Sequence, residues 1–175
     1  MPAPQLSIVI PTYKSAAIVP NLAQALRDAL QDRSYEAIFV NDRSPDKSWE
    51  AICNEANHDK QVIGIHLRKN VGQDRAIMAG LSEARGAYVV IMDDDLQHKP
   101  SDIPALYDEV IKGYDVCYAN FFKKKQSPIK NLYSWVAGKF AERVLHKPPH
   151  IYLSPFKIIK KEVVDAALLY KGPFP

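Results

Sequence analysis

The sequence contains little cysteine. Cys53 and Cys117 are the two cysteines among 175 residues, and they stand far apart with no Cys-x-x-Cys spacing. This pattern indicates neither a disulfide framework nor a thiolate zinc site. We therefore expect reduced thiols, as in a cytosolic protein.

Long apolar runs are missing as well. No stretch approaches the roughly 20 residues that a membrane-spanning helix needs, and the first residues lack the basic-then-apolar pattern of a signal peptide. The chain as given is therefore expected to be soluble or peripheral to a membrane. Internal repeats are also absent from the sequence.

A uniformly basic composition, which nucleic-acid binding favours, is lacking too. Residues 1–120 carry 12 Lys and Arg against 17 Asp and Glu, whereas residues 121–175 carry 11 against 3. This division argues against a nucleic-acid partner and favours two different polar ligands or surfaces, with ordinary surface variation as the alternative. With 47% hydrophobic residues, the chain can bury one ordinary core, so we expect one domain.

The first 120 residues do contain a regular alternation of short β-rich runs and amphipathic helical stretches. The expected strands are 6–10, 36–40, 62–65, 87–92 and 114–118, and the expected helices are 18–30, 48–56, 76–84 and 103–111. Near-continuous apolar strands separated by helices predict a Rossmann-like, doubly wound α/β fold with a mostly parallel sheet. A helix over 132–145 and a strand over 151–159 are expected in the remainder.

Polar residues follow several of the expected strands, where ligands bind in this architecture. Three consecutive aspartates after Met92 are the sharpest signal, because adjacent carboxylates at a strand end need a neutralising cation. In extended chain, Asp93 and Asp95 point the same way and Asp94 points elsewhere. Magnesium or manganese, completed by substrate phosphates, suits such a pair. The alternative is an acidic turn that caps the following helix.

Two further strand ends suit a nucleotide. Asn41 and Asp42 offer a donor and an acceptor at the height of a nucleobase, although the same residues fit an ordinary Asx-type turn. The segment 70–73 reads as a helix entry, whose free backbone N–H groups suit phosphate.

Together these segments resemble the inverting family 2 glycosyltransferases of GT-A fold, in the polyprenyl-phosphate branch that includes dolichol-phosphate mannose synthases. The resemblance covers nearly the whole chain. It rests on residues 7–13, 40–46, 68–73, 79–80, 86, 93–97 and 113–116.

The resemblance implies roles for individual residues. Asp93 and Asp95 would form the motif that holds Mg²⁺ or Mn²⁺, and Gln97 would lie beside the sugar and the acceptor phosphate. The residues expected to bind the nucleotide are Pro11, Thr12, Tyr13, Asn41, Asp42, Ser44, Asn70, Gly72, Gln73, Asp93 and Asp94. Catalytic roles are expected for Asp95, Gln97 and Lys157, and acceptor binding for Lys123, Lys130, Ser134 and Lys157.

Three departures from the family pattern are informative. Asn41 stands where the family usually has an aspartate, and residues 154–157 read Ser-Pro-Phe-Lys where many relatives have Gly-Asp-Phe-Arg, so a carboxylate is missing at Pro155. Relatives also continue into membrane helices, so we expect this chain to be a truncated form. Within one domain, residues 1–120 would form the nucleotide-sugar-binding half and residues 121–175 the basic, acceptor-side half.

The favoured function is therefore inverting transfer of a sugar from a nucleotide diphosphate, with UDP the favoured nucleotide, to a polyprenyl phosphate at the cytoplasmic face of a membrane. The partners would be a nucleotide-sugar donor, a lipid-phosphate acceptor and an anionic membrane surface. Three alternatives stay open: a transferase acting on a saccharide hydroxyl, a nucleotide-binding module without catalysis, and a receiver-like signalling domain.

Overall fold

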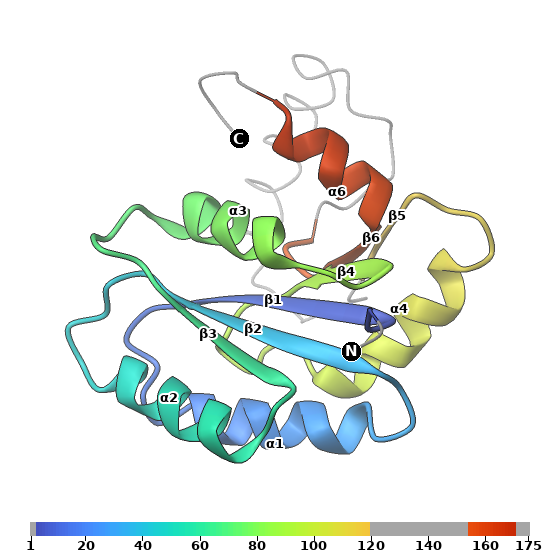
Figure 1. Cartoon of the computed structure of the whole chain (residues 1–175). Coiled ribbons are helices and arrows are strands. Elements are labelled where there is room, and N and C mark those ends of the chain that lie inside the picture. Colours follow the sequence, from blue (N-terminus) through green and yellow to red (C-terminus); the bar gives the residue numbers. More distant parts are fainter. Residues whose placement is uncertain (1–2, 120–153, 171–175) are drawn as a thin grey trace, which may run out of the picture.

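The computed structural model describes residues 3–119 and 154–170. In this part of the chain, six strands form one sheet in the order β3-β2-β1-β4-β6-β5 (Figure 1). The strands are β1 (Leu6–Thr12), β2 (Tyr35–Asn41), β3 (Val62–His66), β4 (Tyr88–Ile91), β5 (Val116–Tyr118) and β6 (Lys157–Lys160). The first four are parallel to one another, and β6 is antiparallel to both of its neighbours.

Helices cover both faces of the sheet (Figure 1). The helices α1 (Val19–Ala29), α2 (Ser48–His58) and α4 (Ile103–Val110) pack on one face, with a short 3₁₀ turn, η1 (Pro100–Asp102), before α4. The helices α3 (Gln73–Glu83) and α6 (Lys161–Leu168) pack on the other. Side chains of β1 alternate between the two faces of the sheet, and each face has its own hydrophobic core. Ile8 and Ile10 belong to the core under α1, α2 and α4, and Val9 belongs to the core under α3 and α6.

The expected alternation of strands and helices is present, with differences at the boundaries. The helix expected from residue 76 begins at Gln73, and the strand expected to reach Met92 ends at Ile91. The strand expected over 151–159 is described as Lys157–Lys160, and the helix expected over 132–145 lies outside the described residues. Helix α6 was not expected from the sequence.

The antiparallel insertion of β6 is the main topological feature that the sequence pattern does not reveal. Ile158, which is fully buried, pairs with Val90 on one side and with Cys117 on the other. Residues 157–160 thus share one sheet with strands from the first 120 residues. The division into a nucleotide-sugar half and an acceptor half stays a prediction.

Helix α3 lies very close to the sheet. A Cβ added at Gly80 would stand 2.4 Å from Val9 Cγ1 and 3.0 Å from Val40 Cγ2. Gly80 lies in the second half of α3, so this approach packs the helix closely on the middle of β1 and near the end of β2.

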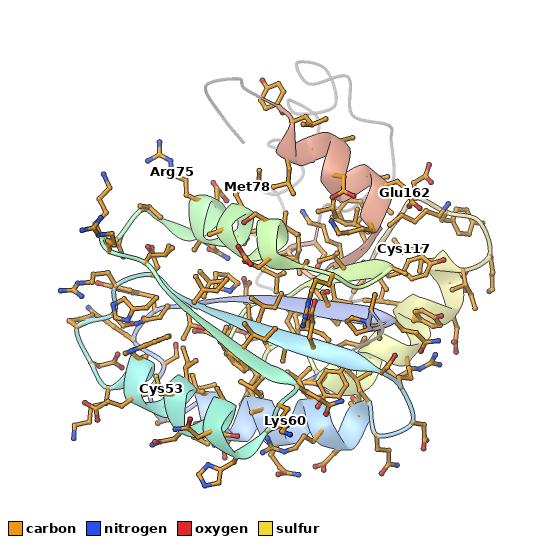
Figure 2. The ribbon with its side chains drawn as sticks, viewed as in Figure 1. Cys53, Lys60, Arg75, Met78, Cys117 and Glu162 are labelled. Atoms are coloured by element: carbon orange, nitrogen blue, oxygen red, sulfur yellow. The ribbon has the colours of Figure 1, made fainter. Side chains whose placement is uncertain are left out.

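The two cysteines lie on separate elements, Cys53 on α2 and Cys117 on β5, and both thiols are free (Figure 2). Among the residues with a described position, no helix is both long enough and apolar enough to cross a bilayer.

Candidate functional site

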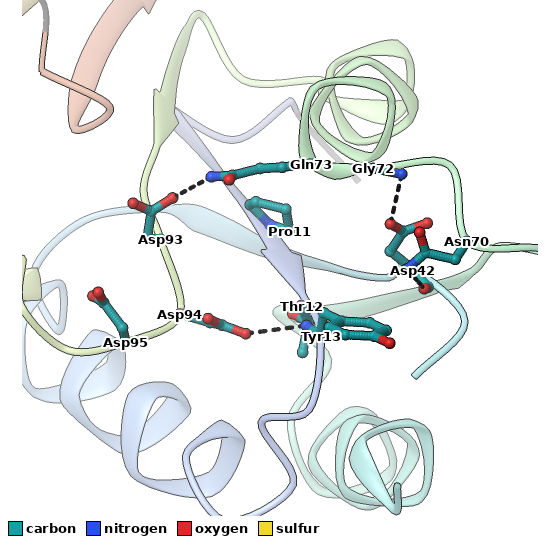
Figure 3. Close-up of a pocket in the computed structure, with 10 residues that line it drawn as sticks. All are labelled: Pro11, Thr12, Tyr13, Asp42, Asn70, Gly72, Gln73, Asp93, Asp94 and Asp95. Atoms are coloured by element: carbon teal, nitrogen blue, oxygen red, sulfur yellow. Dashed lines mark hydrogen bonds between the residues drawn. The ribbon is translucent and has the colours of Figure 1, made fainter. Parts of the chain in front are cut away.

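The carboxyl ends of the parallel strands meet at one edge of the sheet. The register aligns Thr12 of β1 with Asn41 of β2, and Asn41 with His66 of β3. The loops that follow these strands and β4 enclose a cavity of about 510 Å³ (Figure 3). It is lined by Pro11, Thr12, Tyr13, Asp42, Asn70, Gly72, Gln73, Asp93, Asp94 and Asp95.

Asp93 and Asp95 influence each other electrostatically. Burial and the neighbouring Asp95 carboxylate raise the pKa of the Asp93 carboxyl, while His98 and a hydrogen bond from Gln73 oppose this rise. The bond from Gln73 Nε2 to Asp93 Oδ1 is 2.6 Å long and links the start of α3 to the acidic motif. Asp95 is exposed, and its Oδ1 accepts the backbone N–H of Gln97 at 2.9 Å.

Asp94 turns away from these two carboxylates toward Tyr13 (Figure 3). Its Oδ2 accepts the Tyr13 backbone N–H at 3.3 Å and the Ser15 hydroxyl at 2.5 Å. Burial raises the pKa of the Asp94 carboxyl, and these hydrogen bonds only partly oppose the rise. The contrast among the three aspartates agrees with the two-residue periodicity expected at the end of a strand.

Asp42 holds the loop between β3 and α3. The carboxyl group is buried, and its two oxygens accept the backbone N–H groups of Val71 at 2.7 Å and Gly72 at 2.9 Å. Asn70 Nδ2 donates to the Asp42 carbonyl at 3.0 Å. Gly72 has a φ of +88°, a conformation that favours glycine. Two amides that we expected to face phosphate therefore donate to Asp42, whose oxygens still have lone pairs for a further donor.

Asn41 and Ser44 were expected to bind nucleotide, but they do not line the cavity. Asn41 is fully buried, and its Oδ1 accepts the Ser44 backbone N–H at 3.1 Å. Ser44 Oγ in turn accepts the Lys14 backbone N–H at 2.6 Å. In the structure these side chains brace the loops after β1 and β2, and their predicted contact with the nucleotide stays a prediction.

The residues expected to act on the sugar and the acceptor are only partly described. Gln97 is exposed two residues beyond Asp95. Lys157 pairs in register with Ile91, and its Nζ lies 5.8 Å from the centre of the Tyr118 ring. The remaining acceptor residues, Lys123, Lys130 and Ser134, lie outside the described residues.

Sequence reasoning missed a group of residues that support the β1–α1 loop. Ser48 Oγ accepts the Ser15 backbone N–H at 2.8 Å and donates to Asp46 Oδ1 at 2.6 Å. Burial raises the pKa of the Asp46 carboxyl, but hydrogen bonds from Ser48, Ala16 and Ser44 outweigh this effect and lower it overall. Ser15 and Ser48 are 33 residues apart, so no local pattern pairs them, although Ser48 and Asp46 form a local pair two residues apart.

The donor set suits a hard divalent cation that is completed by a ligand. Within the described ranges, no three His, Cys, Asp or Glu side chains gather around one point. Asp93 and Asp95 are instead two interacting carboxylates, a pair whose mutual repulsion a cation would relieve. Mg²⁺ and Mn²⁺ are commonly held by one or two carboxylates together with substrate phosphates.

Comparison with known proteins identifies the family. The profile of Glycosyl transferase family 2 matches residues 7–168. This chain belongs to glycosyl transferase family 2. The family is one of transferases, and the match spans both the acidic motif and the β6–α6 segment.

A similar curated protein comes from Pseudomonas aeruginosa strain LESB58. It is an undecaprenyl-phosphate 4-deoxy-4-formamido-L-arabinose transferase, 31% identical over 170 residues, with 95% of this chain and 50% of that protein covered. The chain thus spans about half the length of the curated relatives it matches. This similarity confirms the resemblance to the polyprenyl-phosphate branch of the family.

Solved structures of similar fold include two with Mn²⁺. Glucosyl-3-phosphoglycerate synthase from Mycobacterium tuberculosis, with Mn²⁺, UDP and glucosyl-3-phosphoglycerate, has a TM-score of 0.71 at 16% identity over 91% of this chain and 58% of that one. The mannosyltransferase PcManGT from Pyrobaculum calidifontis, with GDP-Man and Mn²⁺, has a TM-score of 0.63 at 18% identity. The match covers 94% of this chain and 47% of that one. The prediction of a GT-A, mostly parallel α/β fold is confirmed.

Proposed function

We propose that this protein transfers a sugar from a nucleotide diphosphate donor, with UDP the favoured nucleotide, to a polyprenyl phosphate, with inversion at the anomeric carbon. The observation that carries the proposal is one cavity at the carboxyl edge of the sheet that joins Asp93 and Asp95 to Asp42 and Tyr13. The chain's membership of family 2 and its similarity to an undecaprenyl-phosphate transferase support a polyprenyl phosphate as the acceptor.

The donor diphosphate needs positive charge as it departs. Asp93 and Asp95 would hold Mg²⁺ or Mn²⁺, which supplies charge that stabilises the leaving diphosphate. Tyr13 and Pro11 would hold the nucleoside, and Asp42 has lone pairs free for an N–H of the base.

A phosphate acceptor would not need a general base, which fits the absence of a carboxylate at Pro155. A saccharide hydroxyl loses a proton as it attacks, so it benefits from a general base. A phosphate monoester has a second pKa near ~6, so its attacking oxygen is already largely ionised at neutral pH. In the described part of the chain, the carboxylates that line the cavity are Asp42, Asp93, Asp94 and Asp95, and each has another role.

Lys157 is the described cation that would bind the acceptor phosphate. Lys157 begins β6 opposite Ile91, two residues before Asp93; the residue is partly exposed, and its ammonium group lies beside the Tyr118 ring. A cation there would reduce the repulsion between donor and acceptor phosphates. Gln97, Lys123, Lys130 and Ser134 would complete the sugar and acceptor side. The basic residues 121–175 would face an anionic membrane surface at its cytoplasmic side.

The proposal is tested with the natural full-length protein in detergent micelles. With Mn²⁺ and a panel of UDP-, GDP- and dTDP-sugars, it should glycosylate a polyprenyl phosphate but neither the polyprenol nor a free saccharide. Lys157→Ala should reduce kcat/KM for the acceptor at least about tenfold, the loss expected for one charged hydrogen bond, and change nucleotide affinity little.

Lys160→Ala is the matched control, because Lys160 lies at the other end of β6 and pairs with Asp115 at 3.0 Å. It should leave acceptor use unchanged. Efficient glycosylation of saccharide hydroxyls, with lipid phosphates ignored, would refute the acceptor assignment. Binding of the nucleotide sugar without any transfer would favour a module that lacks catalysis.

A further inference from the structure

The middle aspartate of the acidic motif holds a backbone segment. Both hydrogen bonds to Asp94 end on the same oxygen, Oδ2, one from the Tyr13 backbone N–H and one from the Ser15 hydroxyl. Figure 3 shows the Asp94 side chain directed at this segment, while Asp93 is directed at Gln73. Oδ2 of Asp94 is thus already occupied by donors from the β1–α1 loop.

The same segment is fixed on its other side by α2. The Ser15 backbone N–H donates to Oγ of Ser48, a fully buried residue in the first turn of that helix. Between the two anchors, Lys14 adopts a left-handed conformation with φ of +58°. Such a conformation is uncommon for a residue other than glycine, so the surrounding bonds must hold it.

Tyr13 directly follows β1, and its ring contacts the exposed Lys14, whose Nζ lies 5.3 Å from the ring centre. Its side chain lines the cavity and is 46% exposed, so core packing does not set its position. The Tyr13 backbone N–H is bound to Asp94, across 81 residues of sequence. Without Asp94, the segment would still be held at Lys14, whose backbone N–H donates to Ser44 Oγ, and at Ser15 through Ser48, but the Tyr13 backbone N–H would lose its acceptor.

We propose that Asp94 is a positioning residue that holds the Tyr13–Ser15 segment at the mouth of the cavity, so that Tyr13 meets the nucleoside in one defined place. Asp94 acts through Tyr13 and not as a metal ligand. This inference rests on the proposed nucleotide binding, and it gives the three adjacent aspartates two different tasks.

A positioning residue and a metal ligand should respond differently when the carboxylate is replaced by an amide. Since both hydrogen bonds end on one oxygen of Asp94, the carbonyl oxygen of asparagine can accept both, whereas an amide in place of a carboxylate ligand would hold Mg²⁺ or Mn²⁺ less tightly because it carries no charge. Asp94→Asn should therefore resemble the wild type, and Asp94→Ala should not. Ser15→Ala removes one of the two bonds and should have an intermediate effect.

The experiment combines two measurements on these variants. Calorimetric titration with UDP and Mn²⁺ should show affinity within about threefold of wild type for Asp94→Asn and a loss of about tenfold for Asp94→Ala, as expected for one or two lost hydrogen bonds. Hydrogen exchange of the nucleotide-free protein should show faster exchange at the Tyr13 amide in Asp94→Ala, with protection retained in Asp94→Asn.

The control is Asp115→Ala, at the far end of β5, which should change neither measurement. If Asp94→Asn lost affinity as severely as Asp93→Asn, Asp94 would be a metal ligand and the inference would be wrong. Unchanged affinity and unchanged Tyr13 exchange in Asp94→Ala would also overturn it. A wild-type protein that binds neither UDP nor GDP with Mn²⁺ would refute the proposed function instead.

Discussion

At the residue scale, the four aspartates of the cavity differ in what their carboxylates face. Asp42 and Asp94 accept backbone N–H groups from neighbouring loops, so each is largely satisfied by the protein itself. Asp93 and Asp95 face each other's charge. Residues of one type, three of them adjacent in sequence, thus divide into a pair that shapes the cavity and a pair that suits a cation.

The cation pair gives a first prediction. Asp93→Asn and Asp95→Asn should each weaken UDP binding in the presence of Mn²⁺ by about tenfold or more, because each removes a charged ligand worth at least ~1.4 kcal/mol. Asp94→Asn should weaken it much less. Titration calorimetry with and without Mn²⁺ measures this. Equal losses at all three positions would contradict the assignment.

The raised pKa of Asp93 gives a second prediction about stability. Burial and Asp95 raise this pKa in the folded protein, so the folded state binds a proton more readily than the unfolded state does. Without metal, the contribution of Asp93 to the free energy of unfolding should fall as pH rises from about 3.9, the ordinary aspartate value, through the raised pKa.

Asp93→Asn should remove this cost, since an amide keeps an oxygen for Gln73 and carries no charge. The metal-free variant should therefore be more stable than wild type at pH 7, with the difference shrinking toward pH 4. Urea unfolding at several pH values, with chelator present, measures the effect. A metal-free variant less stable than wild type at pH 7 would count against the argument.

At the element scale, the edge of the sheet opposite the cavity depends on one buried carboxylate. Glu36 of β2 is 3% exposed, and it accepts the Ser7 hydroxyl at 2.6 Å and the Arg85 backbone N–H at 2.7 Å. The Arg85 guanidinium also donates to it at 2.9 Å and 2.5 Å. Ser7 Oγ in turn accepts the Gly86 backbone N–H, so β1, β2 and the entry to β4 are joined.

Glu36→Ala should lower the free energy of unfolding by about 3 kcal/mol, because it leaves the buried Ser7 hydroxyl and the part-buried Arg85 backbone N–H without an acceptor. Arg85→Ala should cost about 1 kcal/mol or less, since the Arg85 side chain is 64% exposed and the pair is screened by solvent. Urea unfolding compares the two variants. UDP affinity should stay unchanged in both variants at temperatures where they are folded. Equal losses in the free energy of unfolding would show that the exposed Arg85 guanidinium contributes as much stability as Glu36.

At the scale of the whole molecule, charge is divided along the chain. The first 120 residues are acidic on balance, and the remaining 55 carry 11 basic residues against 3 acidic ones. The cavity aspartates belong to the acidic part and Lys157 belongs to the basic part. Such a division suits a protein that binds a metal-associated nucleotide on one side and anionic lipid on the other.

This division gives a prediction for membrane association. The lysines at 123–125 should attract anionic vesicles by about 1 kcal/mol per basic residue near the surface, and salt should weaken the attraction. Cosedimentation with anionic and neutral vesicles at low and high salt measures it. A variant neutralised at Lys123, Lys124 and Lys125 should bind less, and identical binding of the two proteins would show that these lysines do not attract the membrane.

Over the first 119 residues, the sequence by itself determined the order of the strands and helices and the set of polar residues at the strand ends. Apolar periodicity and the place of Asp93 or Asp42 after a strand are local features, so they can be read without knowing the fold. It also indicated that Asp94 would point away from its neighbours, because successive residues of extended chain alternate in direction.

Only the tertiary structure decided what each of these side chains contacts. Ser15 and Asp94 are 79 residues apart, and no local pattern pairs them. The same holds for Gln73 with Asp93, 20 residues apart, and for β6, whose insertion between β4 and β5 depends on pairing with strands about 40 or more residues earlier in the chain. Contacts of this kind depend on how the sheet is assembled, which periodicity along the chain does not encode.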